Sequence, residues 1–266
     1  MKKIILILVS VILLIGCQQD KTITESNKEP SKEITTYKEV IKDSKVEIDG
    51  ICYDIKSVTK STFTYDNNGN LIEKAITNDD DELRIEYLYE NNQLIEDRSY
   101  TNDELSYTSY YYYEDDQLIK KRTIFKSNLE VILECSYGDH VKTQTNFRSN
   151  GKISFIATVY LDDDDKILKV INTKPDGEVM TSSTFYYEND QLKKVIRKSD
   201  GVYNTTFSYE YNNIGDKIME YDIIHGEVNT LVAMFYDYEY YETLLPKTLT
   251  VYRIQAPIAE ENIRDY

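Results

Sequence analysis

The stretch Phe185-Tyr186-Tyr187-Glu188-Asn189-Asp190-Gln191-Leu192-Lys193-Lys194 contains the pattern that decides the fold. It joins the aromatic end of one extended segment, a short polar turn and the start of a second extended segment. Asn and Asp suit such a turn because they tolerate left-handed backbone and hydrogen-bond their own turn. Related phrases occur at 65–72, 89–95, 113–119 and 211–218. The sequence therefore predicts consecutive antiparallel hairpins.

Tyrosines recur at or near these turns. They are Tyr65, Tyr89, Tyr113, Tyr137, Tyr160, Tyr187, Tyr211 and Tyr236. The first four are 24 residues apart (89 − 65, 113 − 89 and 137 − 113), and the spacing then loosens. A fixed period of roughly 20–50 residues marks an array of one supersecondary unit. The predicted fold class is all-β, an antiparallel meander of about eight hairpin repeats with a period near 24 residues, as an open twisted sheet, a half-shell or a barrel.

Four consecutive tyrosines are the candidate ligand contacts. Alternation along a strand places Tyr110 and Tyr112 on one face and Tyr111 and Tyr113 on the other. Aromatic ladders of this kind form either the core of a sheet or an exposed binding platform, and tyrosine suits both because its ring is apolar and its tip is polar. We expect this segment to contact a ligand if the sheet has an exposed platform.

Two short motifs resemble known repeat families. Tyr65–Leu71 resembles the YD repeat of RHS-type proteins and of bacterial lipoproteins with the same motif, over roughly residues 63–241. Tyr186–Leu192 is similar to the MORN-variant repeats of antitoxin-like lipoproteins. The resemblance implies a β-repeat scaffold and no enzyme residues. About eight copies are too few for the large toxin-enclosing shell of RHS-type proteins.

The N-terminus has the features of an export signal. A basic start is followed by the apolar run 4–15, which is shorter than the roughly 20 residues that a membrane-spanning helix needs. The run ends in Leu14-Ile15-Gly16-Cys17, which resembles a bacterial lipobox. We expect residues 1–16 to be a lipoprotein signal peptide and Cys17 to be lipidated, which anchors the protein to a membrane.

Beyond the anchor, composition divides the chain. Residues 17–36 lack periodic apolar residues, which predicts a disordered tether after the lipidated Cys17. Residues 37–266 are predicted to form one β-hairpin repeat domain. The hairpin 46–53 and the segment 244–254 are predicted to cap its two edges.

Charge excludes two classes of protein. The formal net charge of −16 repels nucleic acid, so no nucleic-acid partner is expected. Runs such as 95–98 and 119–122 place charges on both faces of a strand, whereas a membrane barrel needs a lipid-facing apolar band.

No residue pattern indicates catalysis, a metal site or a cofactor. Cys52 and Cys135 form either one disulfide or two free thiols, and His140 and His225 are predicted turn residues. The acidic runs 79–82 and 162–165 are predicted solvated turns, with Ca²⁺ binding as the alternative.

The sequence favours a membrane-anchored lipoprotein of the bacterial cell envelope, at the outer membrane or cell surface and not in the cytoplasm. It would act as a non-catalytic binding or scaffold module for a glycan or a protein. The alternative is a structural or immunity-like module with a protein partner and no small ligand. A glycan-active enzyme is less favoured, because none of the 47 acidic residues is singled out by its setting.

Overall fold

A computed structural model describes residues 41–42, 45–48, 51–78, 81–199, 204–212, 214–225, 229–241 and 243–257. All of them belong to the compact unit Ile34–Tyr266. The predicted signal peptide, Cys17 and the predicted tether lie outside the described residues. No helix among the described residues is long and apolar enough to cross a membrane.

Every regular element of the described residues is a β-strand. The strands are β1 (Ile41–Lys42), β2 (Lys45–Ile48), β3 (Ile51–Tyr65), β4 (Leu71–Thr77), β5 (Glu82–Glu90), β6 (Gln93–Thr101), β7 (Glu104–Glu114), β8 (Gln117–Phe125), β9 (Glu130–Gly138), β10 (Val141–Phe147), β11 (Ile153–Leu161), β12 (Ile167–Thr173), β13 (Val179–Glu188), β14 (Gln191–Ser199), β15 (Asn204–Tyr211), β16 (Lys217–His225), β17 (Thr230–Tyr240) and β18 (Pro246–Pro257).

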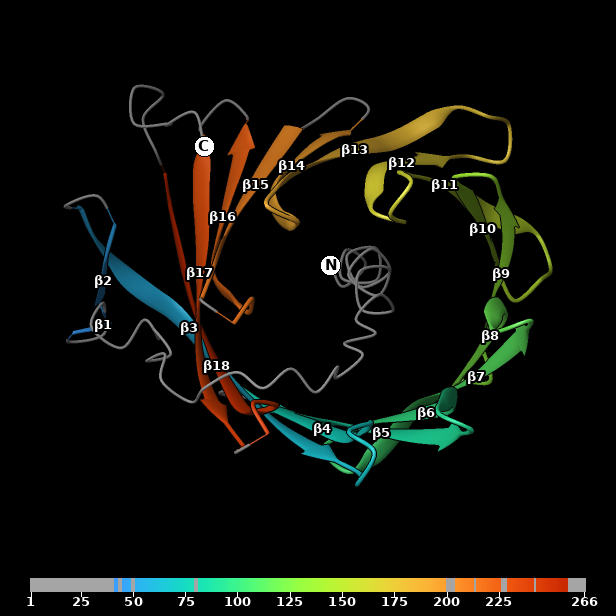
Figure 1. Cartoon of the computed structure of the whole chain (residues 1–266), viewed down its shortest axis with the longest axis horizontal. Coiled ribbons are helices and arrows are strands. Elements are labelled where there is room, and N and C mark those ends of the chain that lie inside the picture. Colours follow the sequence, from blue (N-terminus) through green and yellow to red (C-terminus); the bar gives the residue numbers. More distant parts are fainter. Residues whose placement is uncertain are drawn as a thin grey trace. The chain divides into compact units, whose positions relative to one another are not determined.

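The sheet closes on itself. Each strand from β3 to β17 pairs antiparallel with the next, and β18 returns to pair with β3 through the register Thr248↔Thr62 to Ile254↔Ile55 (Figure 1). The result is a barrel of sixteen strands, β3–β18. The predicted all-β antiparallel meander is confirmed, and of its three predicted forms the barrel is present.

The prediction for the two sheet edges was wrong. The hairpin within 46–53 forms, as the pairing of β2 with β3, but β3 continues beyond it and pairs with β18. The segments expected to cap separate edges therefore join one another, because closure leaves β3 and β18 no free edge to cap.

Turn chemistry fixes the hairpins. In the opening stretch, Asn189 and Asp190 have φ values of 49° and 63°, and Glu188 pairs with Gln191 around them. Two consecutive left-handed residues are the signature of a type I′ turn, whose twist matches that of the flanking strands. Longer turns place one left-handed residue at their fourth position, for example Gly69 with a φ of 84°.

The two faces of the barrel wall differ in burial. From β3 to β14, all buried side chains lie on one face; they are Ser61, Asp97, Ser99, Ser109, Gln144, Ala157, Val159, Val170, Ser183 and Val195. We assign this face to the interior, because side chains converge on the concave side of a closed sheet. The other face is called the outer wall.

Tyrosine hydroxyls cap the ladders at one end of the barrel. The turns that follow the odd-numbered strands from β3 to β17 lie at this end, called the first rim. The β6–β7 ladder ends at Glu96↔Tyr110, and beyond it the Tyr113 hydroxyl donates to the Leu94 carbonyl at 3.0 Å. Equivalent bonds join Tyr137 to Leu118, Tyr187 to Ile167 and Tyr238 to Lys217. Each one satisfies a carbonyl that the ladder has left without a strand partner.

The outer wall is apolar over β16–β18. Its buried cluster consists of Met219, Tyr221, Ile223, Leu231, Ala233, Phe235 and Ile254. Tyr53 and Ile55, from the start of β3, pack against it together with Tyr252. Here both faces of the wall are buried, so this arc contains the main hydrophobic core of the described residues.

Candidate functional site

The four candidate tyrosines occupy both faces of β7. On the interior, the Tyr111 hydroxyl donates to Asp97 Oδ2 at 2.5 Å, and the Tyr113 hydroxyl donates to the Leu94 carbonyl. Both hydroxyls are therefore used within the fold. Tyr110 and Tyr112 lie on the outer wall, opposite Arg122 and Lys120 of β8. Tyr112 is 43% exposed, whereas Tyr110 is half-buried.

Tyr110 lines a hollow of about 490 Å³ at the β7–β8 arc, called the Tyr110 hollow. Its lining residues are Glu104, Leu105, Thr108, Tyr110, Ile124, Phe125, Lys126 and Asn128. A β-bulge at Ser99/Tyr100 pairs Leu105 with Tyr100 and so adjusts the register at this end of β7. The hollow is wide open to solvent, so it is a shallow depression in the outer wall.

Charged and polar groups surround the Tyr110 hollow. Lys126 Nζ lies 2.6 Å from Glu104 Oε2, and this ion pair joins the β6–β7 and β8–β9 connections. The hydrogen bond from Lys126 lowers the pKa of Glu104. Asn128 adds an amide, whose oxygen accepts and whose nitrogen donates hydrogen bonds. An apolar floor with donors and acceptors at its edge can orient a ligand rich in hydroxyl or amide groups.

Arg122 of β8 lies on the outer wall between the tyrosines of β7 and Glu130 of β9. Its Nε and Nη2 donate to the two carboxylate oxygens of Glu130 at 2.9 and 3.1 Å. This bidentate bond raises the pKa of Arg122, and a bond with the Tyr112 hydroxyl adds to the rise. Arg122 is therefore held in place beside Tyr110.

The interior of β6–β8 contains a satisfied ionic network. Asp97 is 4% exposed and accepts from the Tyr111 hydroxyl. Lys121 Nζ donates to the same hydroxyl at 2.7 Å and lies 3.5 Å from Asp97 Oδ2. Beside it, the hydroxyls of Ser109 and Thr123 share a hydrogen bond of 3.1 Å. Such a paired network supports the wall and leaves the Asp97 carboxylate compensated.

A second ionic network lies inside β14–β18, where sequence reasoning had missed it. Glu220 accepts from Lys217, and from the Tyr236 hydroxyl at 2.9 Å. Burial raises the pKa of Asp222 to about 8, and repulsion from Glu220 adds to the rise. The sequence signal was the presence of two acids, two residues apart, within the otherwise apolar strand 218–224.

Two buried polar atoms in this second network have no hydrogen-bond partner among the described residues. They are Asp222 Oδ1, an acceptor, and Arg197 Nε, a donor. The Arg197 guanidinium lies over the Phe207 ring, with its Cζ 5.8 Å from the ring centroid. Burial lowers the pKa of Arg197.

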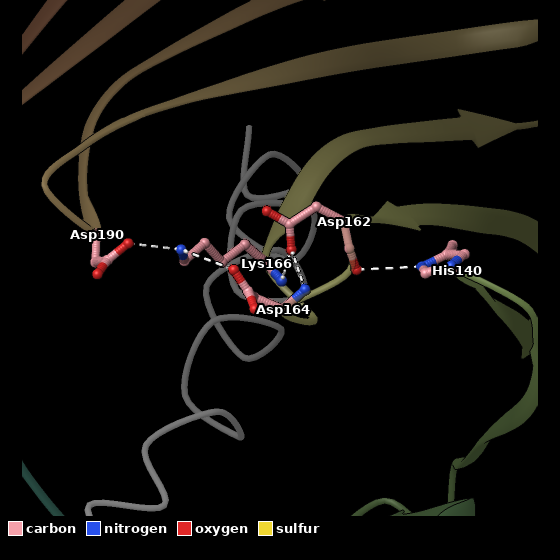
Figure 2. Close-up of polar contacts among 5 residues, drawn as sticks. All are labelled: His140, Asp162, Asp164, Lys166 and Asp190. Carbon is pink, nitrogen blue, oxygen red and sulfur yellow. Dashed lines mark hydrogen bonds and ion pairs between the residues drawn. The ribbon is translucent and has the colours of Figure 1, made fainter.

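The acidic run 162–165 forms a turn on the first rim (Figure 2). Asp162 Oδ1 accepts from the backbone N–H groups of Asp164 and Lys166 at 2.9 and 2.8 Å. Lys166 Nζ lies 2.7 Å from Asp190 Oδ1 and 3.7 Å from Asp164 Oδ2, so a lysine lies between the carboxylates of neighbouring turns (Figure 2). His140 Nδ1 lies 3.2 Å from the Asp162 carbonyl oxygen. Within the described residues, no group of three or more His, Cys, Asp or Glu side chains is arranged to hold a metal ion.

The remaining candidates are placed as follows. No disulfide joins Cys52 on β3 and Cys135 on β9. His140 lies in the β9–β10 turn, and His225 is the last residue of β16. Residues 79–80 of the other acidic run, and Cys17, lie outside the described residues.

Comparison with known proteins identifies no family for this chain. No family model matches the chain, and no curated protein matches it. Among solved structures, a porin-like protein from Bacteroides uniformis ATCC 8492 is similar, with 12% sequence identity and a TM-score of 0.45, over 77% of this chain and 96% of that one.

The predicted relation to the YD and RHS repeat families, and to the MORN-variant repeats, was wrong. The chain forms a closed barrel of sixteen antiparallel strands, in which the last strand pairs with the first, and not a spiral of YD repeats. The short tyrosine-and-turn phrases that suggested the relation are explained by turn geometry and by hydroxyl caps on strand ladders.

Proposed function

We propose that the barrel is a non-catalytic envelope module that binds an uncharged glycan in the Tyr110 hollow. The observation that carries this proposal is the combination, in one hollow of about 490 Å³, of an aromatic ring with the Glu104, Lys126 and Asn128 side chains. The ring offers an apolar face to a sugar, and the polar groups offer donors and acceptors to its hydroxyls. The net charge of −16 disfavours an anionic ligand.

The outer wall supports a barrel that stands in water. Arg98 and Glu96 are joined by an ion pair of 2.5 Å, Arg122 and Glu130 by one of 2.9 Å, and Arg84 also pairs with Glu86. A lipid-facing wall needs an apolar band in place of such pairs. The membrane contact in this proposal is therefore the acyl anchor at Cys17.

The anchor is tested by Cys17→Ser. The variant should move from the membrane fraction to the soluble fraction of cells, because the acyl chains that hold the protein are lost. A variant that stays with the membranes would exclude the anchor and leave glycan binding untouched.

Binding is tested by calorimetric titration of the purified protein with neutral oligosaccharides. Tyr110→Ala should weaken binding by about 2 kcal/mol, or roughly 30-fold, as for an aromatic hot spot. Tyr112→Ala is the matched control, because it removes the same ring from the same face of β7 outside the hollow; it should change binding less than about threefold. Wild-type protein that gives no saturable heat, or equal effects of the two substitutions, would contradict the proposal.

A protein partner is the second candidate. Leu88, Tyr112, Tyr160 and Tyr186 are exposed on the outer wall. Each precedes the position at which the strand register shifts before a first-rim turn. Cross-linking in intact cells should then capture one defined protein, and combined substitution of these residues by Ser should abolish capture while leaving glycan titrations unchanged.

A further inference from the structure

Arg197 and Asp222 face the interior from strands on either side of β15. Arg197 pairs with Thr205 of β15, and Asp222 pairs with Phe207, two residues further along the same strand. The two Cα atoms are therefore about 12 Å apart, given the usual strand and residue spacings. An extended arginine side chain spans about half of this distance, which brings its guanidinium within reach of an aspartate across one intervening strand.

The unsatisfied atoms of these two residues are complementary. Arg197 Nε carries an N–H group that donates to no group among the described residues, and Asp222 Oδ1 accepts from none. Buried donors and acceptors are normally paired, so each exception calls for a second arrangement or a bound molecule. The two groups attract one another once Asp222 is ionised, since the Asp222 charge acts to raise the pKa of Arg197.

Other groups around Asp222 explain why it is not hydrogen-bonded to Arg197. Asp222 is faced by Glu220 and Lys217 of β16, Arg253 of β18, Tyr236 of β17 and Tyr209 of β15. Lys217 and Tyr236 both donate to Glu220, so the neighbouring carboxylate takes the nearest donors. Asp222 shares a hydrogen bond with Glu220, which requires a proton between the two carboxyl groups.

We propose that Arg197 and Asp222 form a proton-dependent latch across β14, β15 and β16. With the proton present, Asp222 is neutral and the guanidinium stays over the Phe207 ring. When Asp222 releases this proton to solvent, Arg197 Nε donates to Asp222 Oδ1, and the new ion pair ties three strands of the wall together. The latch responds to mild alkalinity, because burial raises the pKa of Asp222 to about 8. It does not depend on glycan binding, which is proposed for the opposite face of β7–β8.

The latch is tested by NMR of the whole purified protein, with two nuclei followed over a series from about pH 6 to about pH 10, which brackets the Asp222 titration. One nucleus is the Asp222 carboxyl carbon, and the other is the Arg197 Nε–H group. Both should titrate once with the same midpoint, and the Nε–H proton should exchange more slowly with water on the alkaline side. The Arg122 Nε–H group, which donates to Glu130 on the outer wall of β8–β9, is the internal control in the same sample and should not follow that midpoint.

Variants separate the latch from a simple titration. Asp222→Asn removes the ionisable group, so the Arg197 signal should no longer change with pH. Arg197→Lys keeps the positive charge without the Nε group, so the carboxyl carbon should still titrate while the slow-exchanging proton is lost. An Arg197 Nε–H signal that is constant over the series, or that changes equally in Asp222→Asn, would overturn the proposal. The wild-type measurement needs no substituted protein, so a variant that fails to fold leaves the test intact.

Discussion

Asp97 on β6 and Asp222 on β16 both point into the barrel, and their surroundings are opposite. Asp97 accepts from Tyr111 and lies 3.5 Å from Lys121. Asp222 has a second carboxyl group as its hydrogen-bonding neighbour, and its Oδ1 has no partner in the part of the chain that the structure describes. Two residues away on the same face, Asp97 has Ser99 and Asp222 has Glu220. The comparison teaches that a buried carboxylate is compensated where a hydroxyl and a cation lie beside it, and keeps its proton where it is desolvated beside a second carboxyl group.

The same two arcs differ on the outer wall. β16–β18 bury an apolar cluster there, whereas β5–β8 expose side chains such as Leu88 and Tyr112. Burial of apolar area supplies most of the stability of a domain. The arc with the unpartnered interior atoms is thus also the arc with the strongest core, which offsets their cost.

The largest effect is expected for Phe235→Ala, at the centre of that core and 2% exposed. Loss of a buried phenylalanine should lower the free energy of unfolding by about 3–5 kcal/mol, because it removes apolar contacts and leaves a cavity. Chemical denaturation gives this value directly. Tyr112→Ala on the outer wall of the other arc is the control and should cost less than about 1 kcal/mol. Equal losses of unfolding free energy in the two variants would show that β16–β18 contain no stronger core than β5–β8.

Asp97→Asn should have the next largest effect. It removes the charge that compensates Lys121 and weakens the acceptor of the Tyr111 hydroxyl, at an expected cost of about 2–3 kcal/mol. Denaturation at neutral pH measures the loss. A cost below about 0.5 kcal/mol would show that the network contributes as little as an exposed ion pair.

Asp222→Asn should change the stability of the fold in the opposite direction from Asp97→Asn. The raised pKa means that the folded protein retains a proton that the unfolded chain releases near the ordinary aspartate pKa of about 4. Wild-type stability should therefore fall as pH rises from there toward 8, by at most about 1.4 kcal/mol per pH unit. The asparagine variant lacks this term, so its stability relative to wild type should increase with pH. Denaturation at pH values of about 5, 7 and 9 tests this window; a variant that loses stability relative to wild type as pH rises would contradict the assignment.

The smallest effects are expected for the tyrosine hydroxyls that cap the ladders. Tyr238→Phe and Tyr113→Phe each leave one carbonyl without its donor and should cost about 0.5–1.5 kcal/mol. Tyr137→Phe should cost less, because its bond is exposed and water replaces the hydroxyl. Thermal melts of the three variants would rank them. An equal loss of stability in all three variants would indicate that the burial of the hydroxyl–carbonyl hydrogen bond does not affect its contribution.

Local structure could be predicted because local chemistry determines it. Asn189 and Asp190 carry the left-handed backbone that a tight hairpin needs, and the alternation of Tyr110 to Tyr113 across two faces follows from strand geometry. The identities of both turn and strand residues are visible over a few positions of sequence. These features gave the correct all-β meander.

Closure could not be predicted, because it depends on contacts between distant residues. Nothing near Thr62 indicates that it pairs with Thr248. The phrase at Tyr65–Leu71 reflects a strand that ends in tyrosine before a turn with Gly69 as its left-handed residue. It therefore fitted a repeat family to which the fold does not correspond.

Only part of the candidate site could be predicted from the sequence. Alternation indicates which tyrosines share a face with Tyr110, but Lys126 and Asn128 come from the next hairpin and enter the hollow through the register of β7 with β8. Glu220 and Asp222 were passed over because acidic residues are common throughout the chain. Their position within an apolar strand, and not their number, distinguishes them.

The pairing of β3 with β18 has a consequence for how the chain is made. β3 emerges from the ribosome early, and its partner is completed only at Pro257. Until then β3 and the newest strand both present open edges, which are templates for strand addition by other chains. A ring joined at such long sequence separation also forms slowly, since the contact comes after all the local hairpins. Newly made copies therefore pass through an interval in which they are vulnerable to aggregation and proteolysis, and that interval ends only when the last strand meets the first.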